Sequence, residues 1–113
     1  MSGKFVISLD FELMWGVRDK RTIENYGESI LGARTAVLEM LNLFKIHDIH
    51  VTWAIVGLLF AENKEEMLEF YPNILPSYIN TNFCQYSYLL NEVGNNEKDD
   101  PYHYAFSLIK KIA

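Results

Sequence analysis

The feature that most constrains the fold of this chain is a pair of β-type segments separated by one helical segment. Residues 5–12 alternate apolar and polar side chains, which predicts a strand whose second face becomes polar at Asp10 and Glu12. Residues 30–46 repeat apolar side chains at helical spacing. Residues 50–57 are β-branched and aromatic, which predicts a strand covered on both faces, as in parallel sheets. This order of elements predicts a βαβ unit.

The second half of the chain predicts shorter helices. Asn63 is suited to cap a helix over residues 64–70, and Pro101 is suited to open a helix over residues 102–112. Residues 75–100 show no clear periodicity. A segment of this length without periodicity is typical of a long loop that carries function or needs a partner.

Composition and charge exclude several classes of protein. The chain has 113 residues, of which 50% are hydrophobic and 22% charged, so residues 1–113 are expected to form one folded domain. A net charge of -5 argues against a nucleic-acid partner, and no apolar run approaches the roughly 18 residues of a membrane span. The single Cys84 excludes an intrachain disulfide. Because the first residues do not read as a secretion signal, we expect a cytoplasmic location.

Two acidic residues at the end of the first predicted strand are the main candidates for chemistry. Asp10 and Glu12 are two residues apart, so both carboxylates are expected on one face. Active sites of open α/β sheets and of βα barrels gather at this end of the strands. Near a cation, one carboxylate of such a pair can be a ligand while the other stays a base. The alternative is a solvated strand end without function, which is the more frequent meaning of a lone D-x-E pattern.

The two β-type segments together carry a resemblance to a known family. Residues 5–12 read F-V-I-S-L-D-F-E, and residues 51–57 read V-T-W-A-I-V-G. With a helix between them, these segments resemble the opening of the polysaccharide deacetylase family, which has a NodB homology domain. The resemblance is strongest from Lys4 to about Pro72. It implies an α/β fold, namely an incomplete (β/α) barrel with a βαβ unit plus extra helices.

The resemblance also implies an activity and site residues. Asp10 takes the place of the general base, and Glu12 that of the metal-binding carboxylate, although the family usually has adjacent aspartates there. The implied reaction is hydrolysis of the carbon–nitrogen amide bond in N-acetylated carbohydrate. A divalent metal, expected to be zinc, would polarise the carbonyl and acidify a bound water. Trp15 follows the motif and is a candidate wall of the substrate groove, with a place in the core as the more frequent alternative.

A second motif of the family is missing from the chain. The family's H-x-x-x-H pair, which supplies further metal ligands, does not occur between Gly57 and Ala113. A βα barrel needs about 200 residues or more. The resemblance therefore implies that residues 1–113 are the truncated amino-terminal part of a deacetylase domain, inactive and without a cofactor when alone. The alternative is a small non-catalytic α/β interaction module. Open strand edges and an apolar face predict self-association in either case.

The remaining candidate ligands have plainer expected roles. His47 and His50 form an H-x-x-H pattern, but a helix-to-strand turn is expected between them, which favours surface or turn positions. His103 is expected to pack or to support the start of a helix. Cys84 is expected to be a semi-buried filler, because nothing electropositive in the sequence would activate its thiolate.

Overall fold

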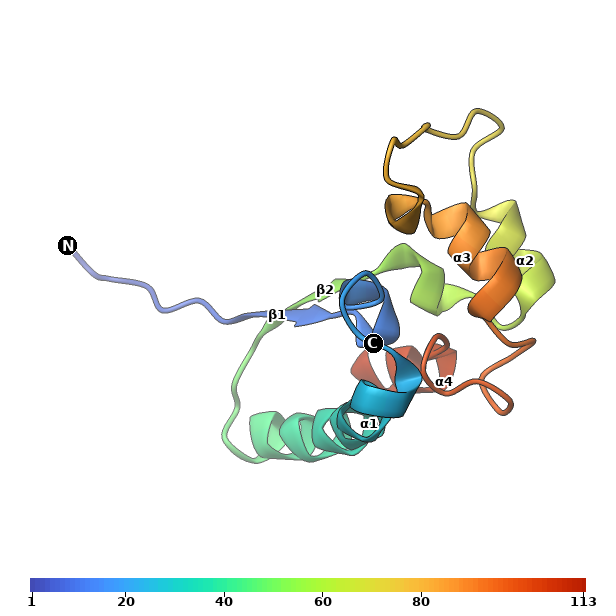
Figure 1. The fold of residues 1–113 in the computed structure, drawn as a ribbon. Coiled ribbons are helices and arrows are strands. Elements are labelled where there is room, and N and C mark those ends of the chain that lie inside the picture. Colours follow the sequence, from blue (N-terminus) through green and yellow to red (C-terminus); the bar gives the residue numbers. More distant parts are fainter.

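The computed structural model describes residues 1–113 as an α/β structure with two strands and four helices (Figure 1). The strands are β1 (Ser8–Phe11) and β2 (Thr52–Ile55). The helices are α1 (Ile23–Ile46), α2 (Lys64–Glu69), α3 (Gln85–Glu92) and α4 (Phe106–Ile112). Short 3-10 helices follow the two strands and precede α3, namely η1 (Leu13–Gly16), η2 (Gly57–Phe60) and η3 (Thr81–Phe83).

The predicted βαβ unit is confirmed. β1 and β2 pair in parallel with Asp10 opposite Ala54, and α1 connects them. The sheet contains only these two strands, so residues 1–113 do not form a barrel. Side chains of β2 alternate between exposed and half-buried, with Thr52 and Ala54 exposed. The prediction that this strand is covered on both faces is therefore wrong, because no part of the chain packs over the face that carries those two residues.

Helix α1 begins seven residues before the predicted start at Ile30. Thr22 caps it, since the Thr22 hydroxyl accepts a hydrogen bond from the Asn25 backbone N–H, and the Asn25 side chain accepts one from the Thr22 N–H. This reciprocal pair satisfies two backbone donors of the first turn. The apolar stripe that guided the prediction contains the buried Ile30 and Val37 and begins only after the first two turns.

The second half of the chain agrees with prediction in part. Asn63 caps α2 by accepting a hydrogen bond from the Glu66 backbone N–H, as expected. α3 lies inside the segment for which no regular structure was predicted. α4 begins at Phe106. The prediction that Pro101 opens this helix is therefore wrong, because Pro101 lies in a turn that precedes it.

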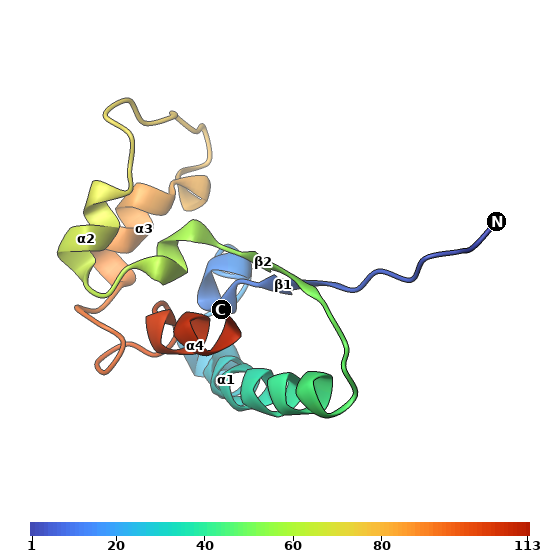
Figure 2. The same cartoon turned by 180° about the vertical axis from the view of Figure 1, so that it is seen from behind.

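The core lies beyond the carboxyl ends of the two strands. α1 and α4 pack together on one side, α2 and α3 lie side by side on the other, and the first residues extend away from both (Figures 1 and 2). Met14 of η1, Leu59 of η2 and Leu89 of α3 are almost completely buried between them. No helix of the structure combines the length and the apolar character needed to cross a membrane. Residues from η1, η2 and α3 thus meet beyond the carboxyl ends of β1 and β2.

Candidate functional site

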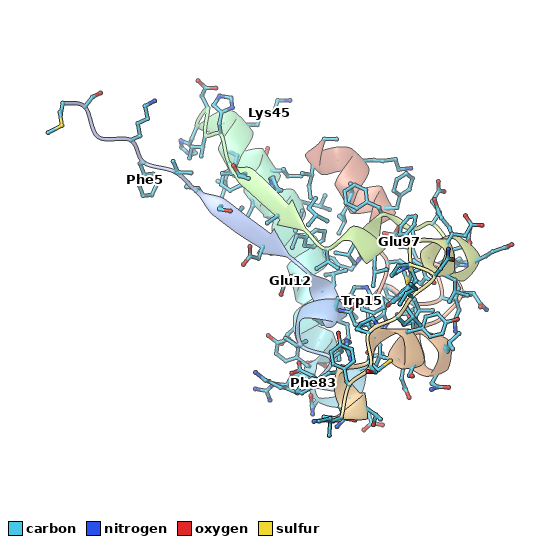
Figure 3. The ribbon with its side chains drawn as sticks, turned by 90° about the horizontal axis from the view of Figure 1, so that it is seen from above. Phe5, Glu12, Trp15, Lys45, Phe83 and Glu97 are labelled. Carbon is cyan, nitrogen blue, oxygen red and sulfur yellow. The ribbon has the colours of Figure 1, made fainter.

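The predicted acidic pair lies at the carboxyl end of β1. Asp10 belongs to the strand. Glu12 follows it directly, at the start of η1 (Figure 3). Both side chains are exposed. Neither carboxylate takes part in the three ion pairs of the chain, and neither lines one of its four cavities. The pair is therefore open to solvent and not enclosed by residues 1–113.

The backbone turns sharply just after the pair. Leu13 has a φ of 49°, a left-handed conformation that is uncommon for a leucine, and its side chain is buried. The Glu12 side chain folds over Gly16, so that a Cβ placed at residue 16 would overlap its carboxylate and lie 2.9 Å from its Cβ. Strained backbone of this kind is concentrated at functional sites.

A buried polar cluster is formed by Asp100 and His103 together with the half-buried Tyr88. His103 is completely buried, with Nδ1 2.8 Å from an Asp100 carboxylate oxygen and Nε2 2.8 Å from the Tyr88 hydroxyl. A carboxylate can only accept, so Nδ1 carries a proton and donates it to Asp100. In the neutral ring, Nε2 then accepts the hydrogen bond of the Tyr88 hydroxyl. The cluster is a continuous chain of hydrogen bonds from α3 to the turn before α4.

The pKa values of Asp100 and Tyr88 keep their hydrogen-bonding forms near neutral pH. Burial acts to raise the pKa of Asp100, but hydrogen bonds from His103 and from the Gly94 N–H outweigh it and leave that pKa below its ordinary value. Burial, together with the nearby carboxylates of Asp100 and Glu92, raises the pKa of Tyr88 to about 12. Asp100 is thus ionised and Tyr88 protonated at pH 7.

Trp15 lies in the core next to this cluster, with 6% of its surface exposed. Its indole N–H donates to the His103 carbonyl oxygen at 3.0 Å, and its ring meets those of Tyr88 and His103 edge-on at 5.8 and 5.3 Å. This is the alternative place given for Trp15 from the sequence. A role in substrate binding stays a prediction.

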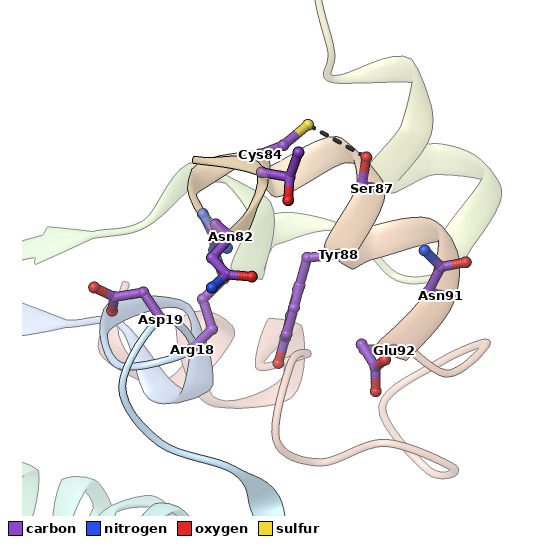
Figure 4. Close-up of a pocket in the computed structure, with 9 residues that line it drawn as sticks. Arg18, Asp19, Asn82, Cys84, Ser87, Tyr88, Asn91 and Glu92 are labelled. Carbon is purple, nitrogen blue, oxygen red and sulfur yellow. Dashed lines mark hydrogen bonds between the residues drawn. The ribbon is translucent and has the colours of Figure 1, made fainter. Parts of the chain in front are cut away.

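Two cavities, of about 370 and 440 Å³, share Arg18, Tyr88 and Glu92 in their walls. Figure 4 shows the smaller one. Arg18 donates to the backbone carbonyls of Asn82 and Phe83, and its guanidinium lies 5.3 Å from the centre of the Tyr88 ring. We call this contact the Arg18–Tyr88 stack. Sequence reasoning missed these cavities, because they form between segments more than 60 residues apart that share no local pattern.

Cys84 is half-buried, as expected from the sequence. It stands at the N-cap of α3, and hydrogen bonds, first from the Ser87 hydroxyl and then from backbone N–H groups, lower the pKa of its thiol despite some desolvation. From the sequence, no electropositive group is expected to activate this thiolate, and the main cause of the lowered pKa is a neutral hydroxyl.

The histidines of the predicted H-x-x-H pattern lie on the surface, as expected. His47 and His50 are exposed, and His50 contacts only the exposed Asp48, at 3.4 Å. No group of three or more His, Cys, Asp or Glu side chains within residues 1–113 is arranged to hold a metal ion.

Comparison of the chain with protein-family models, with curated proteins and with solved structures finds no match.

Proposed function

We propose that residues 1–113 form the amino-terminal part of a metal-dependent carbohydrate N-deacetylase, a hydrolase of amide bonds in N-acetylated sugars. The observation that carries the proposal is the position of Asp10 and Glu12 at the carboxyl end of β1. This strand pairs in parallel with β2. Catalytic groups of α/β sheets and barrels gather at that end. Both carboxylates are exposed and outside every ion pair, so they remain available to a ligand.

In this proposal Asp10 is the general base and Glu12 provides one oxygen ligand to a divalent cation. Catalytic zinc takes about three protein ligands. Glu12 would be one of them, and no group of three or more His, Cys, Asp or Glu side chains within residues 1–113 supplies the others. Residues 1–113 by themselves do not fit a complete zinc site, so the proposal assigns the other ligands to further residues of a longer protein. The two-stranded sheet with unpaired outer edges supports further strands, and hence completion of a (β/α) barrel.

Release of acetate from N-acetylated chito-oligosaccharides tests this function in a protein extended past Ala113. Asp10→Asn should lower kcat about 100-fold or more, because a general base typically contributes 10²–10⁴-fold. Asp99→Asn, an exposed aspartate away from β1, should leave the rate unchanged. Equal rates for Asp10→Asn and the unaltered protein would remove Asp10 as the base. An extended protein that releases no acetate would contradict the deacetylase function itself.

A second candidate function is a non-catalytic α/β module that self-associates. It is favoured by the first residues, where Phe5 is 90% and Val6 75% exposed next to an unpaired strand edge. Exposed apolar side chains beside a free edge promote pairing between chains. Sedimentation velocity should then show association that grows with concentration. A monomer at high concentration contradicts the module, whereas a monomeric and active extended protein supports the deacetylase.

A further inference from the structure

We propose that the two cavities beside the Arg18–Tyr88 stack bind a neutral sugar unit of a carbohydrate chain. The inference deepens the proposed function and rests on it for the identity of the sugar. The residues that line the two cavities support the binding of a sugar by themselves. Their volumes, about 370 and 440 Å³, fall in the range of about 300–1,000 Å³ typical of small-molecule sites.

The walls of the smaller cavity offer both donors and acceptors of hydrogen bonds. Beside the shared residues, the wall contains the amides of Asn82 and Asn91, the hydroxyl of Ser87 and the carboxylate of Asp19 (Figure 4). Every hydroxyl of a sugar both donates and accepts, as such a wall requires. Only two of the nine lining residues are hydrophobic, which disfavours an apolar ligand.

The charges of the walls favour a neutral ligand over an anion. In the smaller cavity, Arg18 is accompanied by the carboxylates of Asp19 and Glu92. The larger cavity contains Arg18 and Arg21 together with Glu24 and Glu92. Positive charge therefore never exceeds negative charge. The Arg18 guanidinium also already donates two hydrogen bonds to backbone carbonyls. A phosphate or carboxylate ligand would meet more repulsion here than a sugar hydroxyl.

The shared wall is held in place before any ligand arrives. Tyr88 is fixed by its hydrogen bond to the buried His103, which Asp100 holds in turn. The side chains of Asp19 and Glu92 form no ion pair and remain free to accept from a ligand. The fixed positions of Tyr88 and Arg18, beside acceptors that are free, lower the entropic cost of binding.

Binding can be measured on the 113-residue chain itself, by following its backbone amide NMR signals during titration with the tetramer of N-acetylglucosamine. We expect saturable shifts at Ser87, Asn91 and Glu92. Asn91→Ala should weaken binding about fivefold to tenfold, the usual effect of one lost hydrogen bond. Asn42→Ala, an exposed asparagine of α1 outside both cavities, is the matched control and should bind normally. Glu92→Gln gives a second, isosteric test of the same wall.

Three results overturn the inference: no shifts with the tetramer, shifts at these residues with inorganic phosphate but not with the sugar, or equal weakening by Asn91→Ala and Asn42→Ala. Its failure is separate from that of the deacetylase. Acetate release by the extended protein without sugar shifts at Asn91 refutes this site alone. Shifts at Asn91 without acetate release refute the catalytic function and keep the site.

Discussion

The carboxyl end of β1 and the buried polar cluster contain similar side chains in opposite situations. Asp10 is exposed, with no partner in an ion pair, whereas Asp100 is 6% exposed and accepts hydrogen bonds from His103, Gly94 and Tyr102. The protein itself satisfies the second carboxylate and leaves the first to solvent. The difference teaches which polar groups hold the fold and which remain available for a ligand.

Removing the Asp100 carboxylate should give the largest effect. Asp100→Ala leaves the His103 Nδ1–H and two backbone N–H groups without an acceptor inside the protein. A buried donor left without an acceptor costs about 1–3 kcal/mol, so the loss of one acceptor shared by three donors removes a large part of the stability of a small domain. Urea unfolding followed by circular dichroism measures the loss. A change in the free energy of unfolding below about 1 kcal/mol would show that Asp100 contributes no more to stability than an exposed carboxylate, and that the two regions do not differ in this respect.

The Tyr88 hydroxyl should matter less than Asp100. Tyr88→Phe removes the donor to His103 Nε2 and keeps the ring in the core, so a loss of about 1–2 kcal/mol is expected. Tyr78→Phe, on a side chain that is 46% exposed, is the control and should change the free energy of unfolding by less than about 0.5 kcal/mol. Identical effects of the two variants would show that the cluster does not depend on this hydrogen bond.

Stability should fall in acid because of the buried cluster. The pKa of Asp100 is lower in the folded than in the unfolded chain, since its hydrogen bonds outweigh its burial. The unfolded chain therefore binds more protons below the ordinary Asp pKa of about 3.9. The stabilisation is complete above that pH and is lost as the pH falls through the folded value, with a slope of at most about 1.4 kcal/mol per pH unit.

The variant Asp100→Asn, which cannot titrate, identifies the source of that slope. Urea unfolding between pH 6 and the acid limit should show a flatter dependence than in the unaltered chain. The slope should not vanish, because hydrogen bonds from Ser107 and Arg34 outweigh burial and lower the pKa of Glu97 as well. An unchanged slope would mean that Asp100 does not contribute to acid unfolding.

The smallest effect is expected at the strand end. Asp10→Asn and Glu12→Gln should each change the free energy of unfolding by no more than about 0.5 kcal/mol, because exposed groups without partners contribute little. The same urea measurement checks this. A loss above about 1 kcal/mol would show that the pair supports the fold, and would weaken the proposal that it is kept for catalysis.

The sequence predicted those features that depend on local periodicity. Alternation in residues 5–12 and the apolar run at residues 50–57 predicted the βαβ unit, and Asn63 predicted the start of α2. Two features could not be predicted in this way. Coverage of β2 depends on which elements pack on it, and the contact of Tyr88 with His103 joins residues 15 positions apart whose neighbours show no common period.

The candidate site was predictable to the same extent. The position of Asp10 and Glu12 at the carboxyl end of a strand follows from the pattern, and the structure agrees with it. The cavities beside the Arg18–Tyr88 stack have no counterpart in the sequence, because Arg18 meets the carbonyls of residues 82 and 83 only after the chain has folded.

Gly16 provides a way to separate the geometry of the acidic pair from its charge. Glycine is needed here for space and not for backbone freedom, because no glycine of the chain has a positive φ and the Glu12 side chain fills the position of a Cβ. A methyl group added by Gly16→Ala would push the Glu12 carboxylate aside and, by its contact with the Glu12 Cβ, shift the turn of η1, while both acids stay chemically intact. Reach and ionisation of the pair can then be varied one at a time, a separation that replacement of either acid does not permit.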